Sequence, residues 1–140
     1  MNVVVESAAP DFLENISTGH HSLQADEPVD AGGRNAAPSP YELLLAALGS
    51  CKVITMRMYA GRRGWPLRSV QIKLSHEKVH AEDCANCLSG GSHLDRIDVE
   101  IKLQGELSTE QCTTLLAVAE KCPVHRTLTS GVQIRTRAAA

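Results

Sequence analysis

Apolar and polar residues alternate along two stretches in the second half of the chain, residues 70–75 and residues 97–104. This period of two predicts two strands, each with one buried face and one solvent-exposed face. The polar stretch between them, residues 77–93, predicts a loop or an extended hairpin arm. Near the C-terminus, residues 132–136 alternate in the same way and predict a last strand.

The N-terminal part of the chain also predicts strands. Residues 2–6 and about 12–27 are rich in β-forming residues, and Gly19 suits a hairpin turn between strands. The adjacent pair His20 and His21 would face opposite sides of a strand, so we expect surface or half-buried side chains there rather than ligands of one metal. The composition of residues 30–38 predicts a loop. Its two glycines would allow the backbone to pass close to a substrate or a second subunit, or would only make a flexible entry to the helix that follows.

A long helix is predicted from Pro40 to Arg62 or Arg63, with Gly64 as its stop. Its start carries a capping-box pattern. From residue 43 to residue 48 it has no polar side, which is typical of a core helix. The apolar spacing predicts a core-facing stripe that consists of Leu44, Leu48, Cys51, Thr55 and Met58.

A second helix is predicted from the capping-box pattern at Ser108 to Lys121, because Pro123 blocks its continuation. Residues 125–130 are expected to form a short turn. The predicted order is β-β-(β)-α-β-β-α-β, which indicates an α+β fold. A length of 140 residues predicts a single domain, 1–140.

Composition narrows the possible partners. Aromatic residues make up only 3% of the chain and the net charge is -2, so we expect neither nucleic acid nor an anionic membrane surface as a partner. The N-terminus carries no signal-peptide pattern, and the strongly apolar run is too short to span a bilayer. We therefore expect a cytoplasmic protein.

In a reducing compartment the five cysteines are better explained as redox, metal-binding or packing thiols than as permanent disulfides. Cys51 lies in the apolar helix and Cys122 stands before a helix-breaking proline. A buried thiol is commonly inert, and it needs a nearby cation or donor to become a reactive thiolate. The residues alone leave both possibilities open, and the candidate partners are Arg34, His125 and Arg126.

The sequence Cys84-Ala85-Asn86-Cys87 forms a CxxC in the polar loop. One CxxC supplies half of a structural zinc site, and His80 could extend it to a His80, Cys84, Cys87 ligand set. The flanking residues do not resemble a redox CxxC, so a local dithiol or an incidental pair is the alternative. Cys112, among polar neighbours on the second helix, is expected to be incidental.

The segment from Pro38 to Cys51, followed by Cys122-Pro123-Val124-His125-Arg126-Thr127-Leu128, resembles the OsmC/Ohr family of osmotically inducible and organic hydroperoxide resistance proteins. The resemblance extends from about Gly32 to Arg137 and includes the order of elements. It implies an OsmC-like fold, with antiparallel sheets wrapped around a long central helix, and an intertwined homodimer.

The resemblance also implies an enzyme, a thiol-dependent peroxidase that reduces organic hydroperoxides. Cys51 would be the peroxidatic thiol and Cys122 the resolving thiol. A dithiol reductant would restore the pair, and no cofactor is implied.

The sequence departs from the family pattern around the peroxidatic thiol. Better-studied members place a glutamate ten residues before that cysteine, where this chain has Tyr41 and carries Glu42 one position later. Their activating arginine lies on an N-terminal strand, and residues 1–27 contain no arginine. Glu42, Arg34 and Arg126 are the candidate supporting residues. These departures favour an alternative, a non-catalytic OsmC-like protein that binds a small molecule or a metal.

Overall fold

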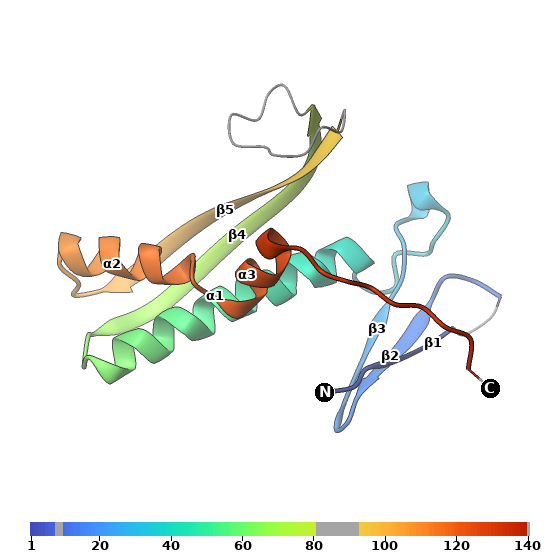
Figure 1. The fold of residues 1–140 in the computed structure, drawn as a ribbon, viewed down its shortest axis with the longest axis horizontal. Helices are drawn as coiled ribbons and strands as arrows, with labels where there is room; N and C mark the ends of the chain where they lie inside the picture. Colours follow the sequence, from blue (N-terminus) through green and yellow to red (C-terminus); the bar gives the residue numbers. More distant parts are fainter. Residues whose placement is uncertain (8–9, 81–92, 140) are drawn as a thin grey trace. The chain divides into compact units, whose positions relative to one another are not determined.

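The computed structural model of the chain describes residues 1–7, 10–80 and 93–139. These residues form two compact units, Met1–Ala46 and Ala47–Ala140. Figure 1 shows the elements of both units in the order β1–β3, η1, α1, β4, β5, α2, α3.

The first unit contains a three-stranded antiparallel sheet in the order β1-β2-β3. Its strands are β1 (Val4–Ser7), β2 (Glu14–Thr18) and β3 (His21–Ala25). The predicted N-terminal strands are confirmed, and Gly19, with φ of 73°, makes the turn between β2 and β3. His20 and His21 are exposed at this turn.

The loop that follows β3 is built around the buried carboxylate of Asp26. This carboxylate accepts hydrogen bonds from the backbone N–H groups of Glu27 (2.8 Å), Arg34 (3.3 Å) and Ala36 (3.0 Å). Gly33 lies so close to Glu27 that an added Cβ would stand 1.9 Å from the Glu27 carbonyl oxygen. The predicted close backbone approach therefore exists, and it is made to the loop's own chain. The short 3-10 helix η1 (Val29–Ala31) lies within this loop.

Helix α1 (Pro40–Arg62) begins in the first unit and continues into the second. The predicted capping box is present, because the Ser39 N–H donates to Glu42 Oε2 at 2.7 Å and the Glu42 N–H donates to Ser39 Oγ at 3.3 Å. The predicted stop is also present at Gly64, whose φ is 65°.

The predicted core-facing stripe of α1 is wrong by a small rotation of the helix. The buried positions are Leu48, Gly49, Lys52, Met56 and Ala60, whereas Cys51 and Thr55 are half-buried, and Leu44 and Met58 are exposed. A helix with apolar residues on every side does not specify which side packs. The face that packs in this chain carries a lysine.

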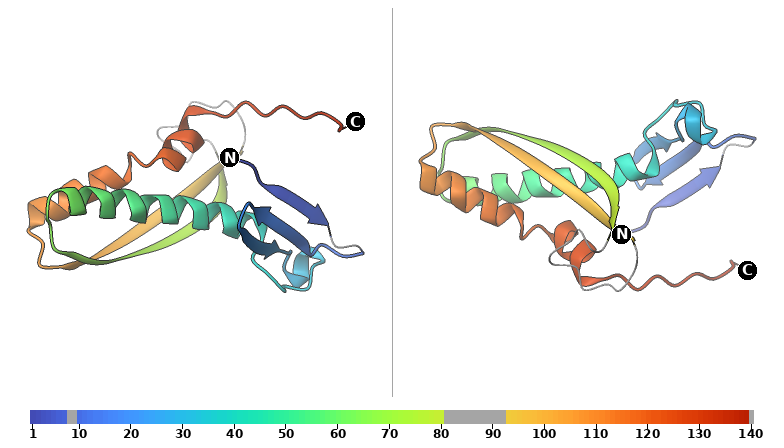
Figure 2. Two further views of the ribbon diagram at one scale, coloured as in Figure 1. Left: turned by 90° about the horizontal axis from the view of Figure 1, so that it is seen from below. Right: turned by 90° about the horizontal axis from the view of Figure 1, so that it is seen from above.

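Strands β4 (Leu67–His80) and β5 (His93–Gly105) form a long antiparallel hairpin, longer than the two predicted strands. The register pairs Val70 with Leu103 and Ile72 with Ile101, so the apolar side chains share one face. These residues pack against a buried cluster that consists of Met56, Ala60, Leu67, Leu115 and Ala119. Figure 2 shows α1 running along the hairpin within this second unit.

Helix α2 (Thr109–Ala119) begins with the predicted capping box of Ser108 and Gln111. Residues 125–130 are not a turn, as was predicted, but belong to helix α3 (Pro123–Ser130). Pro123 occupies the first position of α3, and Cys122 is its N-cap. Proline ends one helix and suits the first position of the next, so Pro123 blocks α2 and also begins α3.

The predicted last strand is absent from residues 131–139, which form no helix or strand in the structure. Val132 and Ile134 are 59% and 83% exposed. An alternating sequence forms a strand only where another edge pairs with it, and this segment pairs with none of the described strands.

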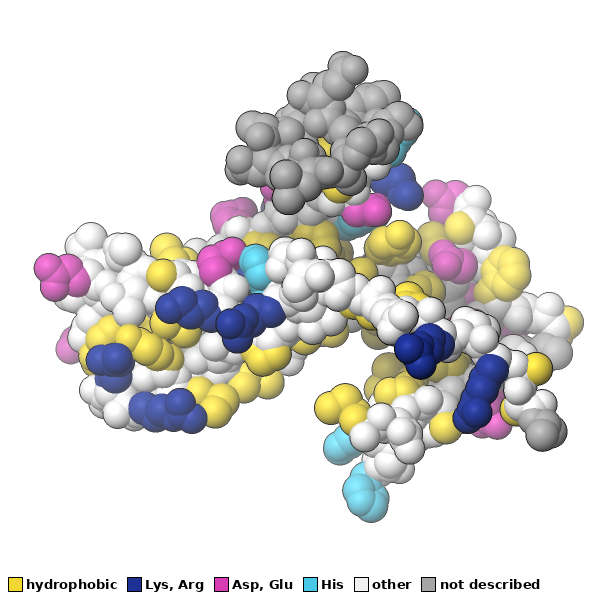
Figure 3. Space-filling model, viewed as in Figure 1, with side chains coloured by type: hydrophobic (Ala, Val, Ile, Leu, Met, Phe, Trp, Pro, Cys, Tyr) yellow, Lys and Arg dark blue, Asp and Glu magenta, His cyan; other side chains and the backbone are white. Residues whose placement is uncertain are grey.

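Within the described part of the chain, α1 is the one helix whose length and mean hydropathy of 1.3 would be enough to cross a membrane. A core helix passes the same test of length and composition, and α1 packs on the hairpin through Met56 and Ala60. Figure 3 shows further apolar side chains at the surface. On α1, Ile54 and Met58 are 55% and 52% exposed.

Candidate active site

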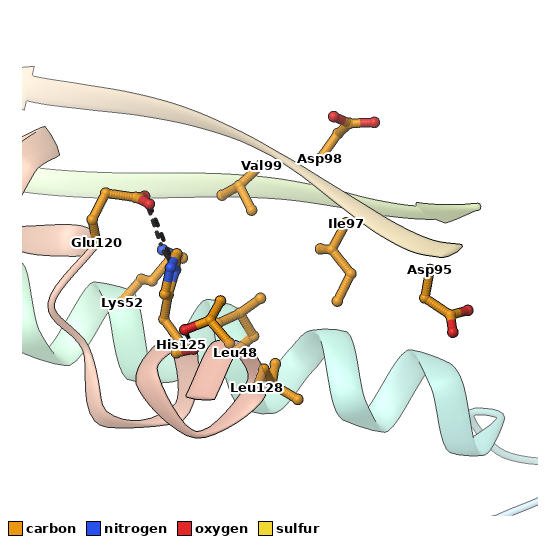
Figure 4. A pocket seen from close by; sticks show the side chains of 10 residues that line it. Leu48, Lys52, Asp95, Ile97, Asp98, Val99, Glu120, His125 and Leu128 are labelled. Carbon is orange, nitrogen blue, oxygen red and sulfur yellow. Dashed lines mark hydrogen bonds and ion pairs between the residues drawn. The ribbon is translucent and has the colours of Figure 1, made fainter. Parts of the chain in front are cut away.

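A cavity of about 400 Å³ opens in the second unit between α1, β5 and α3. Its apolar wall consists of Leu48, Ile97, Val99 and Leu128. Charged and polar side chains complete the lining, and Figure 4 shows most of them around the space: Lys52, Asp95, Asp98, Glu120, His125 and Thr129. The cavity therefore suits a molecule with an apolar part and a polar end.

Lys52 stands at the polar end of this cavity with only 1% of its side chain exposed. Its Nζ lies 3.0 Å from the Ala119 carbonyl oxygen, 3.1 Å from Glu120 Oε1 and 3.0 Å from His125 Nδ1. A buried ammonium is tolerated only when its N–H groups have acceptors and a counter-charge is near. Glu120 supplies that counter-charge, and its 61% exposed carboxylate also lies 3.6 Å from His125 Nδ1.

The structure brings together the two thiols that were predicted to act as a pair. Cys51 is half-buried on α1, and Cys122 is fully buried at the start of α3. They are neighbours in space, because Cys51 is among the groups that raise the pKa of Cys122. Both are free thiols. Neither belongs to the residues that line the cavity, whereas Lys52, the next residue after Cys51, does.

The surroundings of Cys122 include groups that raise its pKa and groups that lower it. Burial is the largest effect and raises the pKa of Cys122, and the neighbouring Cys51 raises it further. The backbone N–H of His125, which donates to Cys122 Sγ at 3.3 Å, and the charge of Lys52 lower this pKa. The net shift is upward, so Cys122 is protonated at neutral pH.

The predicted supporting residues are distributed over both units. In the first unit, Glu42 caps α1, and the Arg34 guanidinium forms an ion pair with Asp11 at 2.8 Å. In the second unit, Arg126 is exposed on α3, and its backbone N–H donates to the Cys122 carbonyl oxygen at 3.1 Å. The buried cation beside the thiols is therefore Lys52, which was not among the predicted residues.

Lys52 had a signal in the sequence. It is the one charged residue between Glu42 and Arg57, in an otherwise apolar or small-residue stretch, and it directly follows Cys51. A lysine so placed needs a specific partner if the helix is buried.

The predicted metal set falls largely on residues that the structure does not describe. Cys84 and Cys87 lie outside the described residues, and so does the side chain of His80. Within residues 1–7, 10–80 and 93–139, no group of three or more His, Cys, Asp or Glu side chains is arranged to hold a metal ion.

The fold is an α+β arrangement in which antiparallel strands accompany a long helix that carries a cysteine, and a second cysteine before a proline meets it. The family model described as OsmC-like protein matches residues 32–137. The chain therefore belongs to the OsmC-like protein family. No protein of curated function matches it in sequence.

Solved structures share this fold at low sequence identity. A putative osmotic stress induced and detoxification response protein from Psychrobacter arcticus 273-4 is 21% identical with a TM-score of 0.71, over 90% of this chain and 86% of that one. An OsmC-like protein from Mycoplasma pneumoniae is 16% identical with a TM-score of 0.68, over 91% and 84% of the two chains. An organic hydroperoxide resistance protein OsmC from Legionella pneumophila, described as a predicted redox protein, is 17% identical with a TM-score of 0.64, over 89% and 85%.

Proposed function

We propose that the protein is a thiol-dependent peroxidase that reduces organic hydroperoxides through Cys51 and Cys122. The observation that carries this proposal is the meeting of two free thiols, 71 positions apart in the sequence (122 minus 51), beside a cavity with an apolar wall. Related structures named as organic hydroperoxide resistance proteins support the same activity for this fold. The apolar wall favours a hydroperoxide with an apolar organic group.

The difference in exposure between the two thiols supports an order of action. Cys51 is half-buried, so its thiolate attacks the terminal oxygen of the hydroperoxide. The O–O bond breaks, Cys51 becomes a sulfenic acid, and the leaving alkoxide takes a proton from water to give an alcohol. Cys122, buried and largely protonated, acts second.

In the second step Cys122 loses its proton and attacks the Cys51 sulfur. An S–S bond forms, and the sulfenic oxygen leaves as water. An external dithiol then reduces the disulfide by thiol–disulfide exchange and is itself oxidised to a disulfide. The cytoplasm is the compartment in which such donors keep thiols reduced, and we propose that the protein acts there.

We further propose that the protein works as a homodimer. Ile54 and Met58 lie one turn apart on α1 and are more than half exposed, and Val132 and Ile134 project from an extended C-terminal segment. Exposed apolar side chains of this kind mark interaction surfaces when they occur together. In a two-fold dimer the same face of α1 would lie on both sides of the interface.

The decisive experiment is to add one equivalent of cumene hydroperoxide to the reduced protein and to count free thiols by mass spectrometry. We expect the loss of two thiols and a linked peptide that contains Cys51 and Cys122. Cys51→Ser should abolish peroxide consumption, and Cys122→Ser should allow one turnover and stop at the sulfenic acid. Cys112→Ser serves as the matched control, because Cys112 is a half-buried thiol on α2, and it should behave as the wild type.

A second candidate function rests on the lining of the cavity. The cavity wall includes Lys52, Glu120 and His125 but neither Cys51 nor Cys122. This arrangement favours a non-catalytic protein that binds a small molecule with a polar end. An unchanged thiol count after hydroperoxide treatment would contradict the peroxidase proposal and support this second function.

A further inference from the structure

The hydrogen bonds of Lys52 determine which nitrogen of His125 carries a proton. A lysine ammonium has three N–H donors and no acceptor. All three donors are used, on the Ala119 carbonyl, the Glu120 carboxylate and His125 Nδ1. His125 Nδ1 must therefore offer a lone pair, and the ring proton lies on Nε2.

The protonated nitrogen belongs to a side chain that lines the cavity, with 27% of the side chain exposed. Within the described residues, no group accepts a hydrogen bond from His125 Nε2. Figure 4 shows His125 beside Lys52, with Leu48 and Leu128 nearby in the lining of the same cavity. The N–H is thus available to a ligand in the cavity.

His125 also adjoins the thiols, because its backbone N–H donates to Cys122 Sγ, and Cys122 neighbours Cys51. We propose that His125 donates a hydrogen bond to the leaving oxygen of a hydroperoxide whose organic group lies in the cavity and whose terminal oxygen extends past the cavity lining to Cys51. Lys52 is then the positioning residue that fixes His125 as the Nε2–H tautomer. The inference rests on the proposed peroxidase function and names the group that stabilises the developing alkoxide.

The role of His125 in this step is that of a donor. As the Cys51 thiolate attacks the terminal oxygen, negative charge develops on the other oxygen of the breaking O–O bond. The neutral imidazole stabilises this charge through its N–H and keeps its own proton, and water protonates the alkoxide. Lys52 adds positive charge at the same end of the cavity, and Glu120 neutralises much of it.

The first test is the tautomer itself, measured by long-range proton–nitrogen NMR on protein labelled with ¹⁵N at histidine, with His125→Gln to assign the His125 signals. We expect the wild-type signal of the Nε2–H form. In Lys52→Met, which keeps an unbranched side chain of nearly the same volume but cannot donate, we expect a mixture of the two neutral forms. The control Lys121→Met removes an exposed lysine that directly follows Glu120 in the sequence. This variant should keep the wild-type pattern of histidine signals. A wild-type signal of the Nδ1–H form would overturn the inference, and so would an unchanged pattern in Lys52→Met.

The second test measures the rate of cumene hydroperoxide consumption. His125→Phe removes the donor, and we expect a loss of about 100-fold, the effect of removing one donor to a developing oxyanion. His125→Gln retains an N–H donor and should recover part of that loss, which a purely structural role would not predict. Thermal unfolding of each variant shows that it is folded, and the wild-type tautomer can be measured even if Lys52→Met does not fold.

The two proposals fail in different ways. If the wild type consumes peroxide and His125→Phe does so at the same rate, the donor role is wrong and the peroxidase function stands. If the wild type consumes no peroxide, the peroxidase function fails and the donor role in it fails too, while the tautomer result still reports on Lys52.

Discussion

Replacing Gly49 by alanine should stabilise the protein less than the same change at an open helix position, although glycine is a poor residue at both. Gly49 is buried on α1, and a Cβ added there would lie 2.8 Å from Leu74 Cδ1 on β4. Carbon atoms in ordinary contact are about 3.5–4.0 Å apart, so α1 or Leu74 must move by about 1 Å. The atom that the Cβ would meet is the end of a half-buried side chain, so Leu74 can turn away at modest cost.

Two effects of opposite sign decide the result. Relief of the helix-propensity penalty stabilises Gly49→Ala by up to about 1 kcal/mol. Overpacking costs about 1–3 kcal/mol, and the movable end of the half-buried Leu74 side chain places this site at the low end of that range. The two effects should therefore nearly cancel, and Gly49→Ala should change the free energy of unfolding by less than about 1 kcal/mol.

Gly61 provides the matched control on the same helix, because nothing lies within 4 Å of a Cβ added there. Gly61→Ala should raise the free energy of unfolding by up to about 1 kcal/mol. Urea unfolding at one fixed protein concentration measures all variants, and the difference between the two alanine variants isolates the contact with Leu74.

A double-mutant cycle completes this test. Leu74→Ala removes the atom that the Cβ would meet, so Gly49→Ala should be more stabilising in that background, by about 1 kcal/mol. The reasoning would be refuted if Gly49→Ala stabilised the protein as much as Gly61→Ala, or if the cycle showed no coupling between positions 49 and 74.

Three further predictions follow from burial and charge. Because burial raises the pKa of Cys122, iodoacetamide at pH 7.5 should label Cys51 first, and peptide mapping in which Cys122 reacts faster would contradict the assigned order. The Ala36, Glu27 and Arg34 backbone N–H groups, Ala36 first, lower the pKa of Asp26, so its charge stabilises the folded state above the unfolded-state pKa and this contribution is lost as the pH falls. Asp26→Asn should accordingly be less stable than the wild type at pH 7, and this difference in stability should shrink below about pH 4. A difference in thermal unfolding temperature that does not depend on pH would argue against this cause. A charge at Met58 or Ile54, such as Met58→Glu, should shift light-scattering mass from dimer to monomer if α1 forms the proposed interface, and an unchanged mass would exclude that face.

Local signals in the sequence were enough to place most elements. The patterns at Ser39–Glu42 and Ser108–Gln111 predicted both capped helix starts, because capping depends on residues three positions apart. Strict alternation predicted the β4–β5 hairpin for a similar reason, since it reports on one face of one strand.

The features that the sequence did not predict depend on partners far along the chain. The packed face of α1 could not be chosen, because apolar residues surround the helix and only the hairpin decides which side is covered. The importance of Lys52 follows from Glu120 and His125, about 70 positions away, whose proximity no local pattern reveals. The strand expected at residues 132–136 needs a pairing edge, and the described strands do not offer one to it.

The separation of the two thiols along the chain links their oxidation to the stability of the folded protein. A Cys51–Cys122 disulfide would close a loop of about 70 residues, and loop-closure entropy of the unfolded chain then favours the folded state by about 4 kcal/mol. Such a bond would make the oxidised protein considerably harder to unfold than the reduced one. Molecules that peroxide has just oxidised would then be the most resistant to proteolysis. Each reduction of the disulfide would return them to a state that unfolds more easily.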